Sequence, residues 1–384
     1  MENNDIYKIY GKNYKEMTKL LLERSRLSGR IPDGARIGIK PNLVSPTPAK
    51  YGATTHTEII AGIIEYLREH GFEKIMIAEG SWVGDRTADA YEYCGYRTLS
   101  EQYEVPFFDT QKDSSHAVNA AGMEIRVCDV VDRIDFLINV PVVKGHGQTR
   151  VTCALKNMKG LIPNSEKRLF HKRGLHQPIA HLSTVLRPDF IVIDHICGDP
   201  ELEDGGNPLE ADCIMTALDP VLTDAYACRI LGYETDDVPY IRMAEQLGTG
   251  SSDLKKCRVT VLDPDNGSEK IYSGLTLDPK EIRRSPTDFL LDVAQAVEEA
   301  DSCSACYGNL TPALMRLKEE GMLENLMEAL PGRICIGQGF AGKKGMFGIG
   351  NCCRNFRQFI PGCPPDEERI YRELKNIIKN QQNR

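Results

Sequence analysis

Short runs of β-branched residues alternate with helical patterns over the first two thirds of the chain, and this alternation constrains the fold most. Residues 36–40 predict a buried strand, and residues 58–70 carry isoleucines at helical spacing until Gly71 ends the pattern. Further strands are predicted at 74–78, 134–143, 190–194, 213–218 and 258–262, with a helix at 221–231. This order predicts an α/β fold whose mixed or mostly parallel sheet is connected by crossover helices.

A change in composition predicts a second unit. Residues 263–286 are rich in Pro and Gly, which predicts a linker, so we expect an α/β core domain over 1–265 and a C-terminal module over 266–384. The module shows helical patterns, a strand at 333–337 and a last helix after Pro364-Pro365. We expect a small α/β unit that holds a metal cluster.

Cysteines near the C-terminus predict that cluster. Cys303 and Cys306 form a Cys-x-x-Cys pair, Cys352 and Cys353 follow Gly-Asn, and Cys363 stands directly before Pro364. Their Gly- and Pro-flanked positions predict turns, where thiolates can converge on a 4Fe–4S cluster. Structural zinc is the alternative, but its sites normally use two close Cys pairs. Cys335 is a weaker candidate because alternation places it inside a strand.

The same segment resembles the cluster-binding pattern of nickel–iron hydrogenase small subunits and of the small cluster subunit of complex I. The resemblance is carried by Cys-Ser-Ala-Cys, Gly-Asn-Cys and Pro-Gly-Cys-Pro-Pro, and it covers about the last 85 residues. It implies Cys303, Cys306, Cys352 and Cys363 as ligands. The doubled Cys352-Cys353 departs from the pattern and leaves the third ligand open.

A basic stretch predicts a second site in the core. Between Lys144 and His176 the chain has eight Lys or Arg residues and one acid, Glu166, although its net charge is −8. Such a stretch can concentrate an anion and stabilise developing negative charge, and its start follows a predicted strand end, where α/β sheets bind ligands. A solvated basic face is the alternative. The predicted catalytic residues are Lys144, His146 and Lys156, and the predicted substrate-binding residues are Lys40, Asn42, Asn157, Lys159 and Asp194.

Several of these residues carry a second resemblance, to the family known as domain of unknown function 362. The resemblance spans roughly residues 35–260. It rests on Lys-Pro-Asn-Leu, Ala-Thr-Thr-His-Thr-Glu, Val-Pro-Val-Val-Lys-Gly-His-Gly, Leu-Lys-Asn-Met-Lys-Gly and Asp-Pro-Val-Leu-Thr-Asp. Many members carry a two-cluster ferredoxin-type module, whereas this chain has the single-cluster pattern. The resemblance implies the fold and the domain boundary but no defined reaction.

Composition limits the classes of function. The acidic net charge argues against a general nucleic-acid binder, and no run approaches the roughly 18 apolar residues of a membrane span. Thirteen scattered cysteines, an odd number, do not suggest a secreted disulfide framework. We therefore expect a cytoplasmic protein without membrane or nucleic-acid partners.

These observations predict an iron–sulfur oxidoreductase that acts on a small anionic substrate in the core domain, with the cluster exchanging single electrons. One alternative is an electron carrier or assembly factor whose basic stretch docks a redox partner protein. Another is a zinc-stabilised binding protein. The sequence leaves a flavin open as a second cofactor.

Overall fold

A mostly parallel sheet forms the centre of the N-terminal unit. The computed structural model describes residues 1–274, 295–300, 302 and 304–382, and places Met1–Arg283 and Arg284–Arg384 in two units. The strands of the large sheet are β1 (Asp5–Tyr10), β2 (Ile37–Lys40), β3 (Ile75–Glu79), β4 (Phe107–Asp109), β7 (Phe136–Asn139), β10 (Phe190–Gly198), β11 (Leu209–Ala217), β12 (Arg258–Leu262) and β13 (Glu269–Ser273). Their order among the described residues is β13-β12-β1-β11-β10-β7-β2-β3-β4.

Pairing confirms the predicted α/β class. From β10 through β7, β2 and β3 to β4, every neighbouring pair is parallel, whereas β11 and β13 run antiparallel to their neighbours. Strand β10 is buried along its whole length. Its side chains alternate between two cores, Phe190 and Val192 on one face and Ile191 and Ile193 on the other. A sheet buried on both faces needs helices on both faces.

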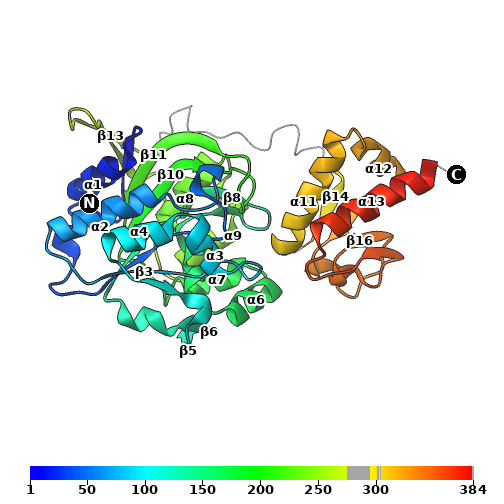
Figure 1. Ribbon diagram of the computed structural model, residues 1–384, viewed down its shortest axis with the longest axis horizontal. Helices are drawn as coiled ribbons and strands as arrows, with labels where there is room; N and C mark the ends of the chain where they lie inside the picture. Colours follow the sequence, from blue (N-terminus) through cyan, green and yellow to red (C-terminus); the bar gives the residue numbers. More distant parts are fainter. Residues whose placement is uncertain (275–294, 301, 303, 383–384) are drawn as a thin grey trace. The chain divides into compact units, whose positions relative to one another are not determined.

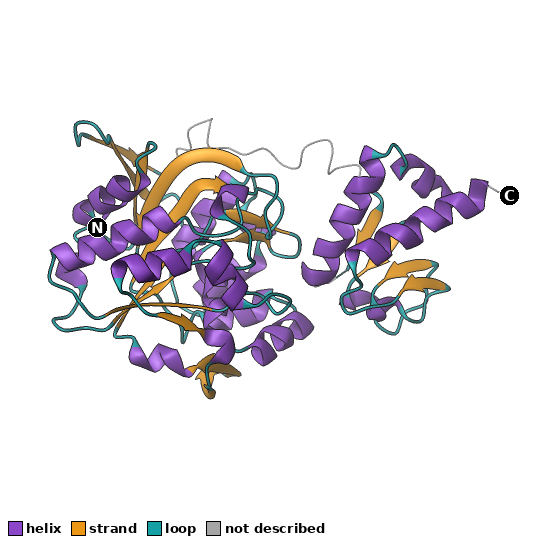
Figure 2. Cartoon of the chain, in the orientation of Figure 1, coloured by secondary structure: helices purple, strands orange, loops and turns teal. Residues whose placement is uncertain are grey.

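Helices cover both faces of the sheet (Figure 1, Figure 2). They are α1 (Tyr14–Arg24), α2 (Thr57–Glu69), α3 (Thr87–Tyr93), α4 (Tyr96–Tyr103), α5 (Ala154–Asn157), α6 (Asn164–Arg173), α7 (His176–Leu182), α8 (Pro220–Ile230) and α9 (Pro239–Gln246). Apolar residues of α1, α2 and α4 pack on one face, and those of α7, α8 and α9 pack on the other. The isoleucines of α2 are all buried, as their helical spacing predicts.

Short elements complete this unit. Two antiparallel pairs are β5 (Ser115–Ala120) with β6 (Met123–Cys128), and β8 (Lys144–His146) with β9 (Arg150–Thr152). Single turns of 3-10 helix are η1 (Ser28–Arg30), η2 (Ala49–Tyr51), η3 (Thr110–Lys112), η4 (Asp129–Arg133), η5 (Met158–Leu161) and η6 (Thr235–Asp237).

The chain changes direction across the sheet beside β2. It passes from β2 to β3 and β4 on one side and then returns to β7 on the other side of β2. The carboxyl ends of β2 and β7 therefore form a topological switch point, the usual ligand-binding place of an open α/β sheet. Lys40, Glu79 and Asn139 are the last residues of β2, β3 and β7.

The C-terminal unit contains a second parallel sheet. Its elements are β14 (Val297–Glu299), α11 (Ser304–Glu319), α12 (Leu323–Ala329), β15 (Ile334–Ile336), η7 (Gln338–Phe340), β16 (Phe347–Ile349), η8 (Asn351–Cys353), β17 (Gln358–Ile360) and α13 (Glu367–Gln382). Strands β14 to β17 lie in chain order. The predicted last helix is present as α13, and its Ile370, Leu374 and Ile378 are buried in the core of this unit.

The predicted linker differs from the structure in its first part. Residues 269–273 form β13, which pairs with β12 at the edge of the large sheet. All five side chains of β13 are exposed, so the strand is held by its backbone hydrogen bonds and carries no apolar pattern. The rest of the predicted linker, from residue 275, lies outside the described residues.

No helix among the described residues combines the length and the apolar character that crossing a membrane requires.

Candidate functional site

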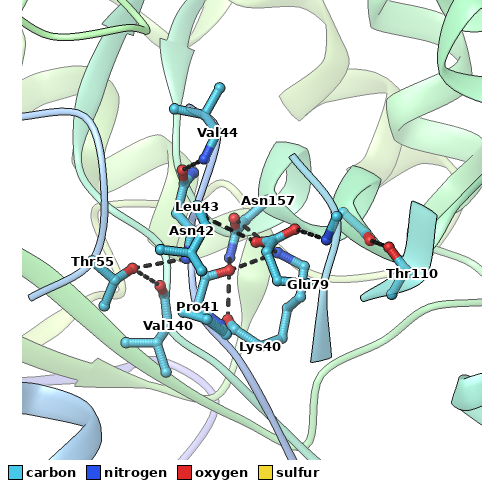
Figure 3. A network of polar contacts seen from close by, with 12 residues as sticks. Lys40, Pro41, Asn42, Leu43, Val44, Thr55, Glu79, Thr110, Val140 and Asn157 are labelled. Carbon is cyan, nitrogen blue, oxygen red and sulfur yellow. Dashed lines mark hydrogen bonds and ion pairs between the residues drawn. The ribbon is translucent and has the colours of Figure 1, made fainter. Parts of the chain in front are cut away.

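A closed polar network occupies the switch point (Figure 3). Lys40 is fully buried, and its ammonium donates to the carbonyl of Pro41 at 2.7 Å and to Oδ1 of Asn157 at 3.2 Å. Its third partner is the carboxylate of Glu79, in a buried ion pair of 2.5 Å. These three contacts use all three hydrogens of the ammonium. Burial lowers the pKa of Lys40, while Glu79 opposes that shift.

Neighbouring residues fix the partners of Lys40. Glu79 also accepts hydrogen bonds from the backbone N–H groups of Leu43 and Gly80. Asn157 donates to Oδ1 of Asn139 at 2.7 Å, which ties α5 to the end of β7. Gly160 lies so close that a Cβ there would be 1.8 Å from Oε1 of Glu79. The network is therefore tightly packed, and it forms the rear wall of the pocket described below.

Lys144 on β8 is also fully satisfied by the protein. Its ammonium donates to the carbonyls of Ala53 and Glu203, at 2.5 and 2.8 Å, and to Oδ1 of Asn42 at 3.3 Å. Burial lowers the pKa of Lys144 to about 8. With its three donors used, Lys144 can position the loops around it but has no hydrogen left for a ligand.

His146 holds the carboxylate of Glu203. The backbone N–H groups of Gln148 and Thr149 both donate to Nδ1 of His146 at 3.0 Å, so the ring proton is on Nε2, which lies 2.8 Å from Oε2 of Glu203. Burial, aided by the nearby Lys156, lowers the pKa of His146 to about 4. A neutral His146 that donates to Glu203 has no accessible base nitrogen, so its geometry fits a positioning residue.

Lys156 forms the second contact of Glu203, through Oε1. Burial alone would raise the pKa of Glu203, but Lys156 and His146 hold it well below the usual value of a glutamate. Glu203 is therefore an anion, and it neutralises part of the positive charge that the lysines bring to this place.

A pocket of about 60 Å³ opens in front of these residues. It is lined by Asn42, Val44, Glu79, Gly80, Ser81, Trp82, Val83, Thr152, Lys156, Asn157, Lys159, Gly160, Lys167, His171 and Glu203. Lys167 of α6 donates to the carbonyls of Gly80 and Ser81, at 2.9 and 2.8 Å, which leaves one hydrogen for another acceptor. Burial lowers the pKa of Lys167 to about 8.

Lys159 differs from the other lysines of the pocket. Within the part of the chain that the structure describes, its ammonium has neither a hydrogen-bond acceptor nor an ion-pair partner. Burial, together with the charge of Lys156, lowers the pKa of Lys159 to about 7. The hydroxyl of Thr152 also lines the pocket, is buried, and lacks a partner among the described residues. Both groups can bind an oxygen of a ligand.

The predicted residues fall into three groups. Asn42, Lys156, Asn157 and Lys159 line the pocket. Lys40, Lys144 and His146 lie behind it and hold the lining residues. Asp194 does not belong to the lining: it accepts hydrogen bonds from His56, the residue before α2. Much of the basic stretch therefore converges in space instead of forming a solvated face.

Sequence reasoning missed the two carboxylates of the site. Glu79 ends a strand and precedes Gly80-Ser81, a signal that could have been used because polar strand ends meet at this edge. Glu203 lies in the acidic loop between β10 and β11, and its contact with Lys156 joins residues 47 positions apart. The sequence carries no local signal for that pairing.

Loops that carry three of the cysteines meet in the C-terminal unit. Cys306 lies in the first turns of α11, Cys352 in η8, and Cys363 shortly after β17. A Cβ on Gly350 would be 3.6 Å from Sγ of Cys306 and 3.7 Å from the carbonyl of Gly362. The backbone N–H of Asn351 donates to the same carbonyl at 2.8 Å. Cys303 lies outside the described residues, and among those described no three His, Cys, Asp or Glu side chains form a metal site.

Cys352 and Cys353 lie in different surroundings. Cys353 is fully buried with Phe340 and Phe356, and its sulfur lies 3.4 Å from the carbonyl of Cys335. Burial raises the pKa of Cys353 to about 11. Cys352 is partly exposed. A protonated thiol in an apolar cluster is a poor metal ligand, because the ligand is the thiolate.

Comparisons with known proteins give the following matches. The family model described as domain of unknown function (DUF362) matches residues 37–229, just over half of the chain. The thylakoid-associated protein sll1697 of Synechocystis is 22% identical over 227 residues, which are 57% of this chain and 70% of that protein. The lactate racemase apoprotein of Thermoanaerobacterium thermosaccharolyticum aligns with a TM-score of 0.35 and 11% identity, over 62% of this chain and 56% of that one.

Proposed function

We propose that this chain, which belongs to the family described as domain of unknown function (DUF362), binds a small anion in the pocket of its core and an iron–sulfur cluster in its C-terminal unit. The family description defines no reaction, so the proposal rests on the residues themselves. The observation that carries it is the ammonium of the partly exposed Lys159, which lines the pocket beside Lys156 without an acceptor of its own among the described residues.

The charge of the pocket favours an anion with more than one negative charge. Four buried lysines and one partly exposed lysine surround it, whereas Glu79 and Glu203 supply two carboxylates; the buried lysines are Lys40, Lys144, Lys156 and Lys167, and the partly exposed one is Lys159. Burial lowers the pKa of four of these lysines, and that of Lys159 falls to about 7, so its ammonium is partly deprotonated at neutral pH while the pocket is empty. A bound anion would restore these charges and replace the lost water.

The lysines differ in how many of their ammonium hydrogens already have acceptors in the protein. Lys40 and Lys144 have three protein acceptors each and act as positioning residues. Lys159, the remaining hydrogen of Lys167 and the hydroxyl of Thr152 are left to contact the ligand. Lys156 contributes its charge while it holds Glu203. We therefore propose Lys159 and Lys167 as the principal anion-binding groups.

The pocket supports a small ligand more than a docked protein. Half of the cations of the basic stretch are buried or line the pocket, namely Lys144, Lys156, Lys159 and Lys167, whereas electrostatic docking uses charges on the surface. The finer proposal is an oxidoreductase that exchanges single electrons with the bound anion. A cytoplasmic location also remains a proposal, supported by the scattered and odd number of cysteines.

The cluster part of the proposal rests on donor chemistry. Cys306 at the start of α11 and the segments that carry Cys352 and Cys363 meet near Gly350, and in the sequence Cys303 stands three residues before Cys306. These four residues would hold a 4Fe–4S cluster, which supplies one-electron transfer when bound. The apolar surroundings of Cys353 support Cys352 as the third ligand.

Calorimetric titration with sulfate tests the anion site, because sulfate stays a dianion near neutral pH. We expect Lys159→Met to weaken binding by about ten to a hundredfold, since a hydrogen bond to a charged group contributes about 1.5–3 kcal/mol. The matched control is Lys172→Met, which removes an exposed lysine from α6. Equal affinity of the wild type and Lys159→Met would contradict the proposed site.

A further inference from the structure

A cysteine, a histidine and an aspartate form a second constellation in the core. Nδ1 of His56 lies 2.8 Å from Oδ2 of Asp194, and Nε2 of the same ring lies 3.7 Å from Sγ of Cys197. His56 is the residue before α2, whereas Asp194 and Cys197 belong to β10, so the contact joins segments about 140 residues apart. None of the three lines the lysine pocket.

Asp194 fixes the orientation of the imidazole. The carboxylate is fully buried, and its Oδ2 accepts from both the backbone N–H and Nδ1 of His56, each at 2.8 Å. Its Oδ1 accepts from the backbone N–H of Ile196 at 3.1 Å. The ring therefore presents Nε2 to Cys197. Nucleophilic thiols are activated by this order of groups, in which a third residue orients the base.

We propose that Cys197 is a reactive thiol for which His56 is the base and Asp194 the positioning residue, and that it is oxidised by small hydroperoxides. Cys197 is 5% exposed and His56 9%, so a small uncharged reagent can reach the sulfur more easily than a bulky one. This site is independent of the proposed anion pocket and of the cluster cysteines.

The reaction balances without a further reactant. In the reacting ion pair the proton is already on Nε2 of His56, and the Cys197 thiolate attacks one oxygen of the peroxide. The S–O bond forms while the O–O bond breaks, and the leaving hydroxide takes the proton from the imidazolium as water. Sulfur loses two electrons and the peroxide gains two, so the product is a sulfenic acid on Cys197.

The surrounding charges favour the thiolate. Burial opposes the positive charge of His56, but Asp194 outweighs it and raises the pKa of His56 to about 11. The other titratable groups facing the site are Tyr14 and Tyr96, whose pKa values are raised, mainly by burial, so both are neutral. One contact favours the protonated thiol over the thiolate. The carbonyl of Ala49 lies 3.4 Å from the sulfur of Cys197 and accepts only from the S–H group.

Cys94 provides a control within the same molecule. It is 8% exposed, and its thiol donates to the carbonyl of Thr47 at 3.3 Å. Burial raises the pKa of Cys94 to about 11, and no imidazole contact is described for it. Cys94 and Cys197 thus share burial and a carbonyl contact, and they differ in the histidine.

The test is peptide-resolved mass spectrometry of the full chain treated with hydrogen peroxide in the presence of dimedone, which traps sulfenic acids. At pH 7 we expect Cys197 to be labelled at least about ten times faster than Cys94.

His56→Gln and Asp194→Asn should remove the advantage of Cys197 over Cys94, while the labelling rate of Cys94 itself stays unchanged. The comparison of the two cysteines within the wild type does not depend on whether these variants fold. Equal labelling of Cys94 and Cys197 in the wild type would overturn the proposal. So would a folded His56→Gln variant in which Cys197 keeps its fast labelling rate.

Discussion

The lysine pocket of the N-terminal unit and the cysteine loops of the C-terminal unit are built on different principles. In the pocket, Lys40 and Lys144 are bound by acceptors from distant segments, so the charges that shape the site also hold the fold together. In the C-terminal unit, backbone hydrogen bonds at Asn351 and Gly362 join the loops, and the core of this unit lies under α11 and α13. Site and stability should therefore be coupled in the first unit and separable in the second.

The strongest test of this contrast is Lys40→Met. Removing one partner of a buried ion pair leaves Glu79 charged without its cation, and such changes cost about 3–5 kcal/mol. We expect that loss in the free energy of unfolding, measured by urea denaturation. Lys159→Met is the matched control and should change it by less than about 1 kcal/mol, because no protein group is left unpaired. Similar losses in both variants would remove the distinction between positioning and ligand-binding lysines.

Cysteine substitutions test whether site and stability are separable in the C-terminal unit. Cys303→Ser, Cys306→Ser, Cys352→Ser and Cys363→Ser should each lose most of the iron and the brown colour, while the thermal unfolding of the N-terminal unit stays unchanged. The measurements are iron and sulfide per chain in anaerobic, reconstituted protein, where the wild type should hold about four of each.

Cys353→Ser is the matched control for the cluster ligands and should retain the iron. Loss of iron in Cys353→Ser with retention in Cys352→Ser would reverse the assignment of the third ligand. Stoichiometric zinc without iron in the wild type would favour the zinc-stabilised binding protein.

The smallest expected effect is the pH dependence of anion binding. The anion binds the charged form of Lys159, whose pKa is lowered to about 7 by burial and by Lys156, so affinity is greatest below that value and falls as the pH rises through it. From pH 6 to 8 the affinity for sulfate should fall by up to about tenfold through this group.

Lys159→Met provides the control for this profile. The other titratable groups of the pocket wall are Lys156, Lys167, His171, Glu79 and Glu203. Burial lowers the pKa of Lys167 to about 8, so a weaker dependence at higher pH should remain in the variant. A wild-type affinity that is constant from pH 6 to 8 would contradict the assignment of Lys159.

The fold and part of the pocket were predictable because they follow local rules. Apolar periodicity predicts the strands and helices, and the carboxyl ends of parallel strands predict where Lys40, Asn42 and Lys159 are gathered. The hydrogen-bond and ion-pair partners of these side chains do not follow from local rules. His146 and Lys144 look like catalytic groups in the sequence, and only their contacts with Glu203 and Ala53 identify them as positioning residues. Likewise, β13 has no apolar pattern that could distinguish it from a linker.

The residue at position 160 indicates whether a related protein can keep this pocket. A side chain at this position would meet Glu79 at 1.8 Å and Cε of Lys40 at 2.5 Å. A relative with any larger residue there must have rearranged the buried ion pair, and with it the rear wall on which the lysines depend. One position in an alignment can therefore separate relatives that are able to keep this anion site from those that share only the sheet.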